Sequence, residues 1–368
     1  MICVNIRVQS CTQYFHHRIT TRSDPFIYEY KTGLYYVPER LEQLKTWLDD
    51  ELDFGEYTLK PASADASFRR YFRVTHTGVS YVVMDAPPDK EDSRPFIKIS
   101  KLFFDLGLNV PEVIDENLQQ GFLLLSDLGS APYLDALNEE TVERLYGDAL
   151  GALATIQACT PDNASLPAYD RTLLLSEMAL CQEWLIGQHL ELVPDNAQTG
   201  MIEAAFGLLA DNALAQPQVC VHRDYHSRNL MLTGRNNPGI LDFQDAVIGP
   251  VTYDLVSLLR DCYIAWPRAR VEDWALGYQE LALQSGILRE DHEDPQQFLR
   301  WFDLMGMQRH LKAAGIFARL NHRDGKPGYL QDIPRTLGYV VDVASRYDEL
   351  EAFGTFIDAE VLGRLKET

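Results

Sequence analysis

Asp224, Asn229 and Asp242 have the residue types and the spacing for one kind of chemistry. Asp224 and Asn229 lie in the stretch His-Arg-Asp-Tyr-His-Ser-Arg-Asn, and Asp242 follows the apolar run Gly-Ile-Leu after a turn rich in Gly, Asn and Pro. Phosphoryl transfer needs a carboxylate that holds or accepts the proton of the acceptor hydroxyl, and hard oxygen ligands for Mg²⁺. We therefore assign Asp224 as the catalytic base and Asn229 and Asp242 as Mg²⁺ ligands.

The alternative for this motif is a capped surface turn without a chemical role. The pattern His-x-Asp-x4-Asn would arise by chance in about one chain in fifty of this composition. Here it is followed by Leu-Asp-Phe at the end of a strand-like run, where a second carboxylate can reach the same metal ion. The motif and its context together favour the chemical role.

The elements that must position these residues change in character near residue 130. Before it, apolar residues at helical spacing begin at Pro38, and segments rich in β-branched and aromatic residues alternate with turn signals. We expect an antiparallel meander in a lobe that ends near residues 127–129. The expected strands are 57–60, 68–74, 80–84, 111–114 and 121–125, and the expected helices lie over 38–52 and 96–106.

After residue 130, long stretches have helical spacing, so the expected fold class is α+β. We expect a nucleotide-binding lobe over 37–128 and a helical catalytic and substrate-binding lobe over 129–368. Residues 1–36 show no sustained period and are expected to be a peripheral, dispensable extension; two acidic residues there weaken the alternative of a targeting peptide. The expected helices are 139–158, 171–189, 198–213, 252–263, 268–285, 296–321, 334–347 and 350–365.

These motifs resemble those of the aminoglycoside phosphotransferase and choline kinase-like superfamily of small-molecule kinases. Residues 221–230 match its catalytic loop, residues 240–243 its metal-binding strand, and residues 249–255 its Gly-Pro turn and Asp-Leu helix start. The resemblance covers about residues 40 to 320. It implies a bilobal protein-kinase-like fold and the cofactors ATP and Mg²⁺, and it assigns the same roles to the Asp, Asn and Asp of the motif.

Further stretches are similar to those of the bacterial anomeric kinases of N-acetylmuramate and N-acetylglucosamine in peptidoglycan recycling. This similarity implies that the γ-phosphate of ATP moves to the C1 hydroxyl of an amino sugar. Because such a hydroxyl is more acidic than an ordinary alcohol, we expect Asp224 to act more by positioning it than by strong base catalysis. The similar stretches are 67–74, 83–88, 122–129, 241–246, 308–312 and 315–320.

The sequence departs from the kinase pattern at the phosphate loop. The turn over residues 63–70 has no glycine to let backbone N–H groups approach phosphate, although its Ala and Ser residues are small. We expect Ser67, Phe68, Arg69 and Arg70 to bind the nucleotide phosphates. The alternative is a polar hairpin whose arginines are solvated.

The third strand is the largest departure, because residues 81–85 contain no lysine for the nucleotide phosphates. Either Arg69 or Arg70 replaces it, or Lys98 or Lys101 reaches in from the helix, or the enzyme relies more on its metal. Asp85 would repel phosphate unless it pairs with one of the arginines, so a structural role is expected for it. At the hinge between the lobes, main-chain groups of Ser126 and Leu128 are expected to bind the adenine.

Candidates for the acceptor site are polar and aromatic residues near the motif. An arginine fork is the natural partner for the lactyl carboxylate of N-acetylmuramate, and Arg228, Arg309 or Lys312 could supply it. Each is otherwise a solvated helix charge. The other candidates are His226, with Tyr263 and Trp266, for the sugar ring, and Gln244 and Asp245, which either touch substrate hydroxyls or cap a turn.

Two further residues of the motif region are expected to be structural. His222 is expected to orient the loop, without acid or base chemistry. Asp254 lies at a helix start and is expected to be an N-cap or a buried partner of the catalytic-loop backbone.

Composition narrows the class of partner. The formal net charge of −21 leaves no basic surface for nucleic acid or an anionic membrane, which favours a small-molecule substrate. Six scattered cysteines without a CxxC pair indicate free thiols, and no apolar run approaches the roughly 20 residues that span a bilayer. We expect a cytoplasmic monomer.

Two other functions remain open from the sequence. One is a kinase of another small molecule, such as an aminoglycoside, choline or homoserine, and the negative chain would suit a cationic acceptor. The other is a nucleotide-binding pseudokinase, which the missing strand lysine suggests but the intact motif residues oppose.

Overall fold

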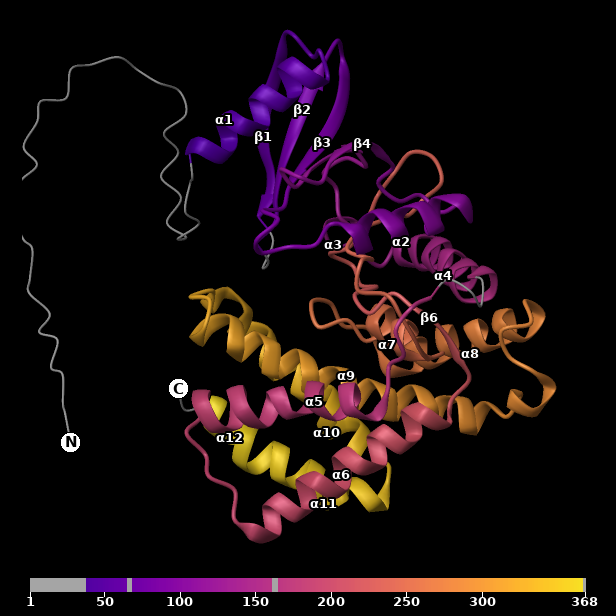
Figure 1. Cartoon of the computed structure of the whole chain (residues 1–368). Helices are drawn as coiled ribbons and strands as arrows, with labels where there is room; N and C mark the ends of the chain where they lie inside the picture. Colours follow the sequence, from indigo (N-terminus) through magenta and orange to yellow (C-terminus); the bar gives the residue numbers. More distant parts are fainter. Residues whose placement is uncertain (1–37, 65–67, 161–164, 367–368) are drawn as a thin grey trace, which may run out of the picture. The chain divides into compact units, whose positions relative to one another are not determined.

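The computed structural model describes residues 38–64, 68–160 and 165–366 of the 368-residue chain (Figure 1). The expected N-terminal extension and the candidate Ser67 lie outside the described residues. Their assignments stay predictions.

The first lobe contains an antiparallel sheet of five strands in the order β1-β2-β3-β5-β4. The meander predicted for the first three strands is confirmed, since β1, β2 and β3 pair in sequence order, whereas β5 and not β4 lies beside β3. Thr77 and Gly78 join β2 to β3 with φ values of 49° and 82°, which is the backbone of a tight two-residue hairpin. The elements of this lobe are α1 (Pro38–Thr46, continued as a π-helical turn over Trp47–Glu51), β1 (Tyr57–Ala64), β2 (Arg70–His76), β3 (Val79–Asp85), α2 (Arg94–Asp105), β4 (Val113–Asn117) and β5 (Phe122–Ser126).

The two faces of this sheet have different roles. Because side chains alternate along a strand, Val74 and Val83 lie on one face, where they pack with Trp47 at the end of α1. Tyr71 and Arg73 have the opposite parity and line a pocket on the other face. The register of β2 therefore decides which arginines can reach a ligand in that pocket.

Contacts between aromatic rings join the first lobe to the strand region that carries the motif. Phe96 and Phe103 of α2 lie with their ring centroids 5.0 and 5.9 Å from that of Phe243. Asn109 also forms a β-bridge with Gly239, and its Nδ2 donates a hydrogen bond to Thr233 Oγ1 at 3.2 Å. These contacts place the sheet beside Asp242, which precedes Phe243.

The second region is mainly helical, as predicted, and its helices are coloured from magenta to yellow in Figure 1. The main departures from the expected helices are the π-helical continuations near residues 181 and 357, and the end of α7 at Leu259 where the expected helix runs to residue 263. The helices are α3 (Tyr133–Ala136), α4 (Val142–Cys159), α5 (Arg171–Leu180, with a π-helical stretch over Cys181–His189), α6 (Asn196–Ala215), α7 (Tyr253–Leu259), α8 (Arg268–Gln284), α9 (Pro295–His322), α10 (Ile333–Ala344), α11 (Glu351–Phe356, with a π-helical turn over Ile357–Leu362) and α12 (Gly363–Leu365).

Helix α9 is the central element of this lobe. It has 28 residues, and most of its middle is buried on all sides, as expected for a helix packed by other helices around its circumference. At Gly315 a Cβ atom would lie 2.3 Å from the carbonyl carbon of Leu180, so only glycine permits this approach to α5. Helix α9 is thereby fixed against α5.

Two pairs of short strands hold the motif itself. β6 (Gln218–Val221) pairs with β9 (Val247–Pro250), and β7 (Leu230–Met231) pairs with β8 (Gly239–Ile240). The loop with Asp224 follows β6, and Asp242 follows β8 by two residues. In the described part of the chain, no helix has both the length and the apolar character needed to cross a membrane.

Candidate active site

A buried carboxylate holds the backbone of the loop after β6. Asp254, at the start of α7, accepts hydrogen bonds from the backbone N–H groups of His222 at 2.6 Å and Arg223 at 2.9 Å. His222 Nδ1 accepts a hydrogen bond from the backbone N–H of Asp224 at 3.2 Å. Burial lowers the pKa of His222 to about 4, so its ring is neutral at pH 7. Both His222 and Asp254 thus have the structural roles that the sequence predicts.

The structure brings Asp224, Asn229 and Asp242 together. Asn229 Nδ2 donates hydrogen bonds to the backbone oxygen of Asp224 at 3.0 Å and to Asp242 Oδ2 at 3.3 Å. The backbone N–H of Leu241 donates to the backbone oxygen of Asn229 at 2.9 Å, which ties the loop to the following strand. Asp242 has a φ of 64°, an uncommon conformation for a residue with a side chain and one found often at functional sites.

The side chains of Asn229 and Asp242 fit a magnesium ion. Two hydrogen bonds engage the amide nitrogen of Asn229, and neither uses its oxygen Oδ1. Among the described residues, no group of three or more His, Cys, Asp and Glu side chains could hold a metal ion alone. Mg²⁺ is commonly bound by one or two carboxylates together with water and substrate phosphates, so this small oxygen donor set suits it.

Asp224 is half-buried and surrounded by positive charge. Burial acts to raise the pKa of its carboxyl, but the charge of Lys312, followed by those of His226 and Arg309, outweighs this effect. The pKa is held below its ordinary value. Asp224 is therefore ionised at pH 7 and able to accept a hydrogen bond from an acceptor hydroxyl.

A buried network lies behind this positive charge. Lys312 Nζ lies 3.0 Å from Glu177 Oε1 and donates a hydrogen bond to the hydroxyl of Tyr253 at 3.0 Å. Arg223, next to Asp224 in the chain, forms a second ion pair with Glu177. Glu177 therefore balances two cations, whose charge would otherwise be expensive to bury.

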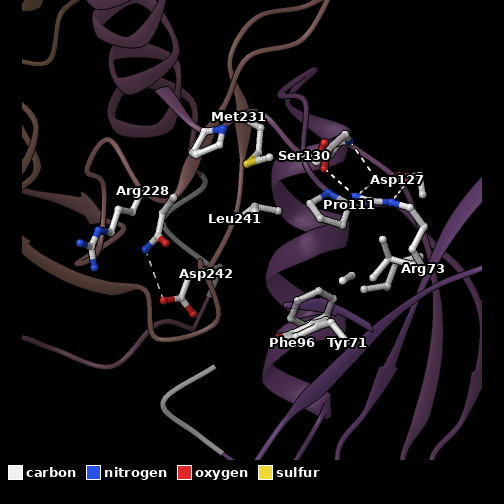
Figure 2. A pocket seen from close by; sticks show the side chains of 18 residues that line it. Tyr71, Arg73, Phe96, Pro111, Asp127, Ser130, Arg228, Met231, Leu241 and Asp242 are labelled. Carbon is white, nitrogen blue, oxygen red and sulfur yellow. Dashed lines mark hydrogen bonds and ion pairs between the residues drawn. The ribbon is translucent and has the colours of Figure 1, made fainter. Parts of the chain in front are cut away.

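A pocket of about 390 Å³ lies beside the motif, between the sheet and the short strands (Figure 2). Its volume is in the range of small-molecule sites. Tyr71, Val82, Phe96 and Leu125 supply apolar surface from the first lobe, and Asn229 and Asp242 lie on the opposite side, with Ser126, Leu128, Met231 and Leu241 among the other lining residues. The two residues expected at the hinge thus line the same pocket as the two expected metal ligands.

Arg73 forms a clamp at the hinge end of this pocket. Its guanidinium donates to both carboxylate oxygens of Asp127, at 2.6 and 3.0 Å, and to the backbone oxygen of Gly129 at 2.8 Å. Asp127 also accepts hydrogen bonds from Ser80 Oγ and from the backbone N–H of Gly129. The clamp fixes the hinge against β2 and β3.

The arginines expected at the phosphate loop lie elsewhere. Arg70 pairs with Asp85, which also binds Arg40 of α1, so its guanidinium is on the sheet face covered by α1. Arg70 does not face this pocket, because residues one strand position apart point to opposite faces. Its assignment to the nucleotide phosphates stays a prediction. The structural role of Asp85 is confirmed.

Phe68 and Arg69, the other two described residues expected to bind the phosphates, do not line the pocket either. Phe68 is 64% exposed, and its backbone N–H donates to Glu91 Oε1 at 3.3 Å. Arg69 pairs with the same carboxylate at 3.2 Å. Neither of the two lysines offered as replacements lines the pocket: Lys98 donates to the backbone oxygen of Ser165, and Lys101 is exposed beside Asp105.

The acceptor candidates are partly brought together. The His226 ring lies 5.4 Å from that of Tyr263, and the guanidinium carbon of Arg228 lies 3.6 Å from the Tyr263 centroid. Arg309 is buried on α9, and Nη1 lies 3.6 Å from Cys262 Sγ. Arg228 also lines the pocket with Asn229 and Asp242, whereas Arg309 lies on helix α9.

Gln244 and Asp245 have different places. Gln244 Nε2 donates to Asp242 Oδ1 at 2.7 Å, so Gln244 orients an expected metal ligand. Asp245 is exposed. The sequence suggests the same roles for both residues, but in the structure only Gln244 contacts an expected metal ligand.

Comparison with known proteins identifies the family. Residues 58–328 match the phosphotransferase enzyme family, and this range contains the sheet of the first lobe and the whole motif. The chain belongs to this family. The resemblance seen in the motifs is thereby confirmed, and the chain is a phosphotransferase with the bilobal α+β fold expected from its sequence.

Individual relatives of this phosphotransferase cover most of its length. An N-acetylmuramate/N-acetylglucosamine kinase of Pseudomonas putida is 48% identical over 328 residues, which cover 86% of this chain and 96% of that protein. A protein of the same name from Neisseria meningitidis is 44% identical over 317 residues, covering 85% and 93%. A solved structure of an ethanolamine kinase from Plasmodium vivax, 11% identical, shares the fold with a TM-score of 0.61 and covers 88% of this chain and 93% of that chain.

The sequence did not single out several residues that build this phosphotransferase site. Arg73 appears in a strand-like segment, but its role depends on strand register. Glu177 lies in a helix far from the motif in sequence, without a local signal for its contact with Lys312. Asp261 follows α7 and accepts hydrogen bonds from the backbone N–H groups of Ser227 and Tyr263, a contact that only the folded chain reveals.

Proposed function

We propose that this phosphotransferase moves the γ-phosphoryl group of ATP to the C1 hydroxyl of N-acetylmuramate and N-acetylglucosamine, in the cytoplasm, during peptidoglycan recycling. The observation that carries the proposal is the convergence of Asp224, Asn229 and Asp242 beside a pocket of nucleotide size. The choice of acceptor is supported by the names of the relatives that are 48% and 44% identical.

In this proposal the nucleotide lies in the pocket of Figure 2. The base packs between apolar residues of both lobes, such as Val82 and Leu241, and forms hydrogen bonds with the hinge. The backbone N–H of Ser126 already donates to the backbone oxygen of Glu112 at 3.0 Å. Ser126 would therefore offer its carbonyl oxygen, and Leu128 its N–H. The Arg73 clamp keeps this edge in place.

The phosphate end of the nucleotide would lie at Asn229 and Asp242, which would hold Mg²⁺. A bound Mg²⁺ would neutralise charge on the phosphate oxygens. Gln244 keeps Asp242 oriented by its hydrogen bond of 2.7 Å. The chain thereby supplies a rigid pair of ligands whose positions depend on backbone and side-chain hydrogen bonds.

Asp224 would bind the acceptor hydroxyl and orient its oxygen toward the γ-phosphorus. Its lowered pKa keeps it in the ionised form that accepts a hydrogen bond. A carboxylate whose pKa is lowered is a weaker base, which suits a C1 hydroxyl, since this group is more acidic than an ordinary alcohol. Most of the rate gain would come from alignment and charge neutralisation.

The charge around Asp224 argues against a cationic acceptor. Lys312 and Arg309 contribute positive charge at Asp224, and Arg309 and Arg228 contribute it at the neighbouring His226, so an aminoglycoside or choline would meet positive charge. The intact motif residues also argue against a pseudokinase. We therefore place an amino sugar before these alternatives.

The proposal is tested by a phosphate-transfer screen with ATP and Mg²⁺ over N-acetylmuramate, N-acetylglucosamine, an aminoglycoside, choline and homoserine. We expect turnover with the two amino sugars, and a ³¹P spectrum whose product phosphate couples to the anomeric proton. A product phosphorylated at C6 would contradict the assignment of the hydroxyl. Turnover with choline, homoserine or the aminoglycoside alone would contradict the assignment of the substrate.

A further inference from the structure

Arg228 holds an unusual position in the motif. It directly precedes Asn229 and is exposed, and its guanidinium carbon lies 3.6 Å from the ring centroid of Tyr263 and 5.7 Å from that of Tyr329. Over the ranges that the structure describes, its guanidinium has no ion pair. An arginine stacked on an aromatic face keeps its hydrogen-bond donors in the ring plane available for another group.

A single buried carboxylate fixes both parts of this arrangement. Asp261 Oδ2 accepts hydrogen bonds from the backbone N–H of Ser227 at 2.9 Å and from its hydroxyl, and Oδ1 accepts one from the backbone N–H of Tyr263 at 2.9 Å. Ser227 is the residue before Arg228. Asp261 therefore holds the cation and its aromatic support in one position, which makes Arg228 a preorganised group and not a loose surface charge.

The surrounding charges leave Arg228 able to bind an anion. The charge of Arg228 acts to lower the pKa of Asp332, so the two side chains are near each other. The Asp332 carboxylate is buried, however, and lies 3.4 Å from Arg335. On the other side, the buried Arg309 contributes further positive charge near His226. An anion could thus pair with Arg228, since the nearby carboxylates of Asp261 and Asp332 are engaged by the backbone N–H groups of Ser227 and Tyr263 and by Arg335.

The direction of Arg228 separates two possible anions. Arg228 lines the pocket of Figure 2 on the side of Asn229 and Asp242, and its side chain points away from Tyr71, Phe96 and Arg73 on the side assigned to the nucleotide base. Asp242, an expected metal ligand, is seen between them in this view. An anion on Arg228 would therefore belong to the acceptor and not to the nucleotide.

We propose that Arg228, supported by Tyr263, binds the lactyl carboxylate of N-acetylmuramate and so determines the preference for an acceptor that carries a carboxylate. This inference rests on the proposed function, since it names a contact in the same acceptor site. N-acetylglucosamine has the same ring and the same C1 hydroxyl but no carboxylate. Arg228 is thus a specificity residue whose contribution differs between the two sugars.

The test uses the Arg228→Gln variant with N-acetylmuramate, its methyl ester and N-acetylglucosamine. Glutamine keeps a long polar side chain but removes the charge and the fork. We expect kcat/KM for N-acetylmuramate to fall about 10- to 100-fold, as for the loss of a hydrogen-bonded charge pair. The ratio of kcat/KM for N-acetylmuramate to that for N-acetylglucosamine should fall at least about tenfold.

The methyl ester makes the test specific to charge. With the unmodified enzyme, esterification should lower kcat/KM by about the same factor as the substitution does, and in the variant it should have little further effect. Arg235→Gln is the matched control, because Arg235 is an exposed arginine in the turn between β7 and β8, and its substitution should leave both sugars unaffected.

Other outcomes overturn the inference or the proposed function separately. An equal loss with both sugars, accompanied by a higher KM for ATP, would show that Arg228 binds the nucleotide phosphates. Independent, multiplicative losses from the ester and the substitution would show that the carboxylate does not contact Arg228. If the unmodified enzyme phosphorylates neither sugar, the proposed function itself is wrong.

Discussion

The carboxylate of Asp254 accepts a hydrogen bond from the backbone N–H of His222, with 2.6 Å between Oδ2 and the nitrogen. Its other oxygen, Oδ1, accepts a hydrogen bond from the backbone N–H of Arg223. Arg223 has a φ of 79°, which is uncommon for a residue with a side chain. These two bonds compensate for the cost of the turn that presents Asp224. The catalytic loop therefore depends on a side chain from helix α7.

Replacing Asp254 with asparagine should lower kcat about 10- to 100-fold, because an amide offers one acceptor oxygen to two N–H groups and leaves one unsatisfied. KM for ATP should change little, since the nucleotide pocket does not include Asp254. Steady-state kinetics measures both effects, and circular dichroism checks that the protein is folded. Asp273→Asn, at an exposed site on α8, is the control. A normal kcat in Asp254→Asn would refute this role.

Asp224→Asn and Asp242→Asn should affect turnover in different ways. Loss of the Asp224 carboxylate should lower kcat by about 10²- to 10⁴-fold without changing the Mg²⁺ concentration needed for half-maximal activity. Asp242→Asn should lower kcat and also raise that Mg²⁺ concentration, because a neutral amide binds the ion less well. Titration of activity with Mg²⁺ separates the two roles. Near-normal activity in either variant would contradict the site assignment.

Lys312→Met should move the acidic limb of the kcat/KM profile to higher pH. Lys312 is the leading positive charge that lowers the pKa of Asp224, while burial acts to raise it. Without this charge the Asp224 carboxyl takes up a proton at a higher pH, so activity should disappear sooner as the pH falls. Activity measured between pH 4 and 9 gives the limb, with ATP and Mg²⁺ kept saturating.

A structural role for Lys312 alone predicts a different result. Its loss would then lower the melting temperature and kcat at every pH without moving the limb. Lys312→Arg keeps the positive charge beside Glu177, and its limb should stay close to that of the unmodified enzyme.

The local parts of this site could be predicted from sequence, because they depend on spacing within a few residues. The Asp224 and Asn229 pair is such a part, as is the meander whose turn at Gly78 has the required positive φ. The face of the sheet on which Arg70 lies could not be predicted in this way. Arg70 lies opposite Asp85 in the sheet. This register, which no local signal specifies, places the side chain of Arg70 on the face away from the pocket.

The partners of the charged residues around Asp224 could not be predicted from the sequence either. Arg309 and Lys312 lie one helical turn apart on α9, and the sequence suggests both as anion ligands. Only the packing of α9 shows that Lys312 forms an ion pair with Glu177, whereas the guanidinium of Arg309 lies 3.6 Å from Cys262 Sγ. Such pairings join residues far apart in the sequence, 47 positions for Arg309 and Cys262 and more for Lys312 and Glu177, so helical spacing cannot reveal them.

Arg73→Met should raise KM for ATP about 5- to 30-fold, while kcat changes by less than about threefold. The substitution removes the hydrogen bonds of Arg73 to Asp127 and Gly129, which hold the hinge edge of the pocket. Asp127→Asn should have a similar effect. Because the two side chains act through one contact, the double variant should be no worse than either single variant. Fully independent effects on KM would exclude the clamp.

Gly315→Ala should lower the free energy of unfolding by about 1–3 kcal/mol, as do other overpacked helix contacts. The new Cβ would lie 2.3 Å from the carbonyl carbon of Leu180, and this backbone atom cannot move aside as a flexible side chain could. Since α9 carries Lys312, its displacement from α5 should also lower kcat. Urea unfolding measures the first effect and initial rates the second.

Gly277→Ala provides the matched control, because Gly277 lies within α8 and a Cβ atom there would meet nothing within 4 Å. Alanine has the higher helix propensity, so this change should raise the free energy of unfolding by up to about 1 kcal/mol. The two substitutions are chemically identical, and the sign of their effects should differ only because of the contact with Leu180. Equal effects on stability would show that α9 and α5 do not pack as closely as this contact requires.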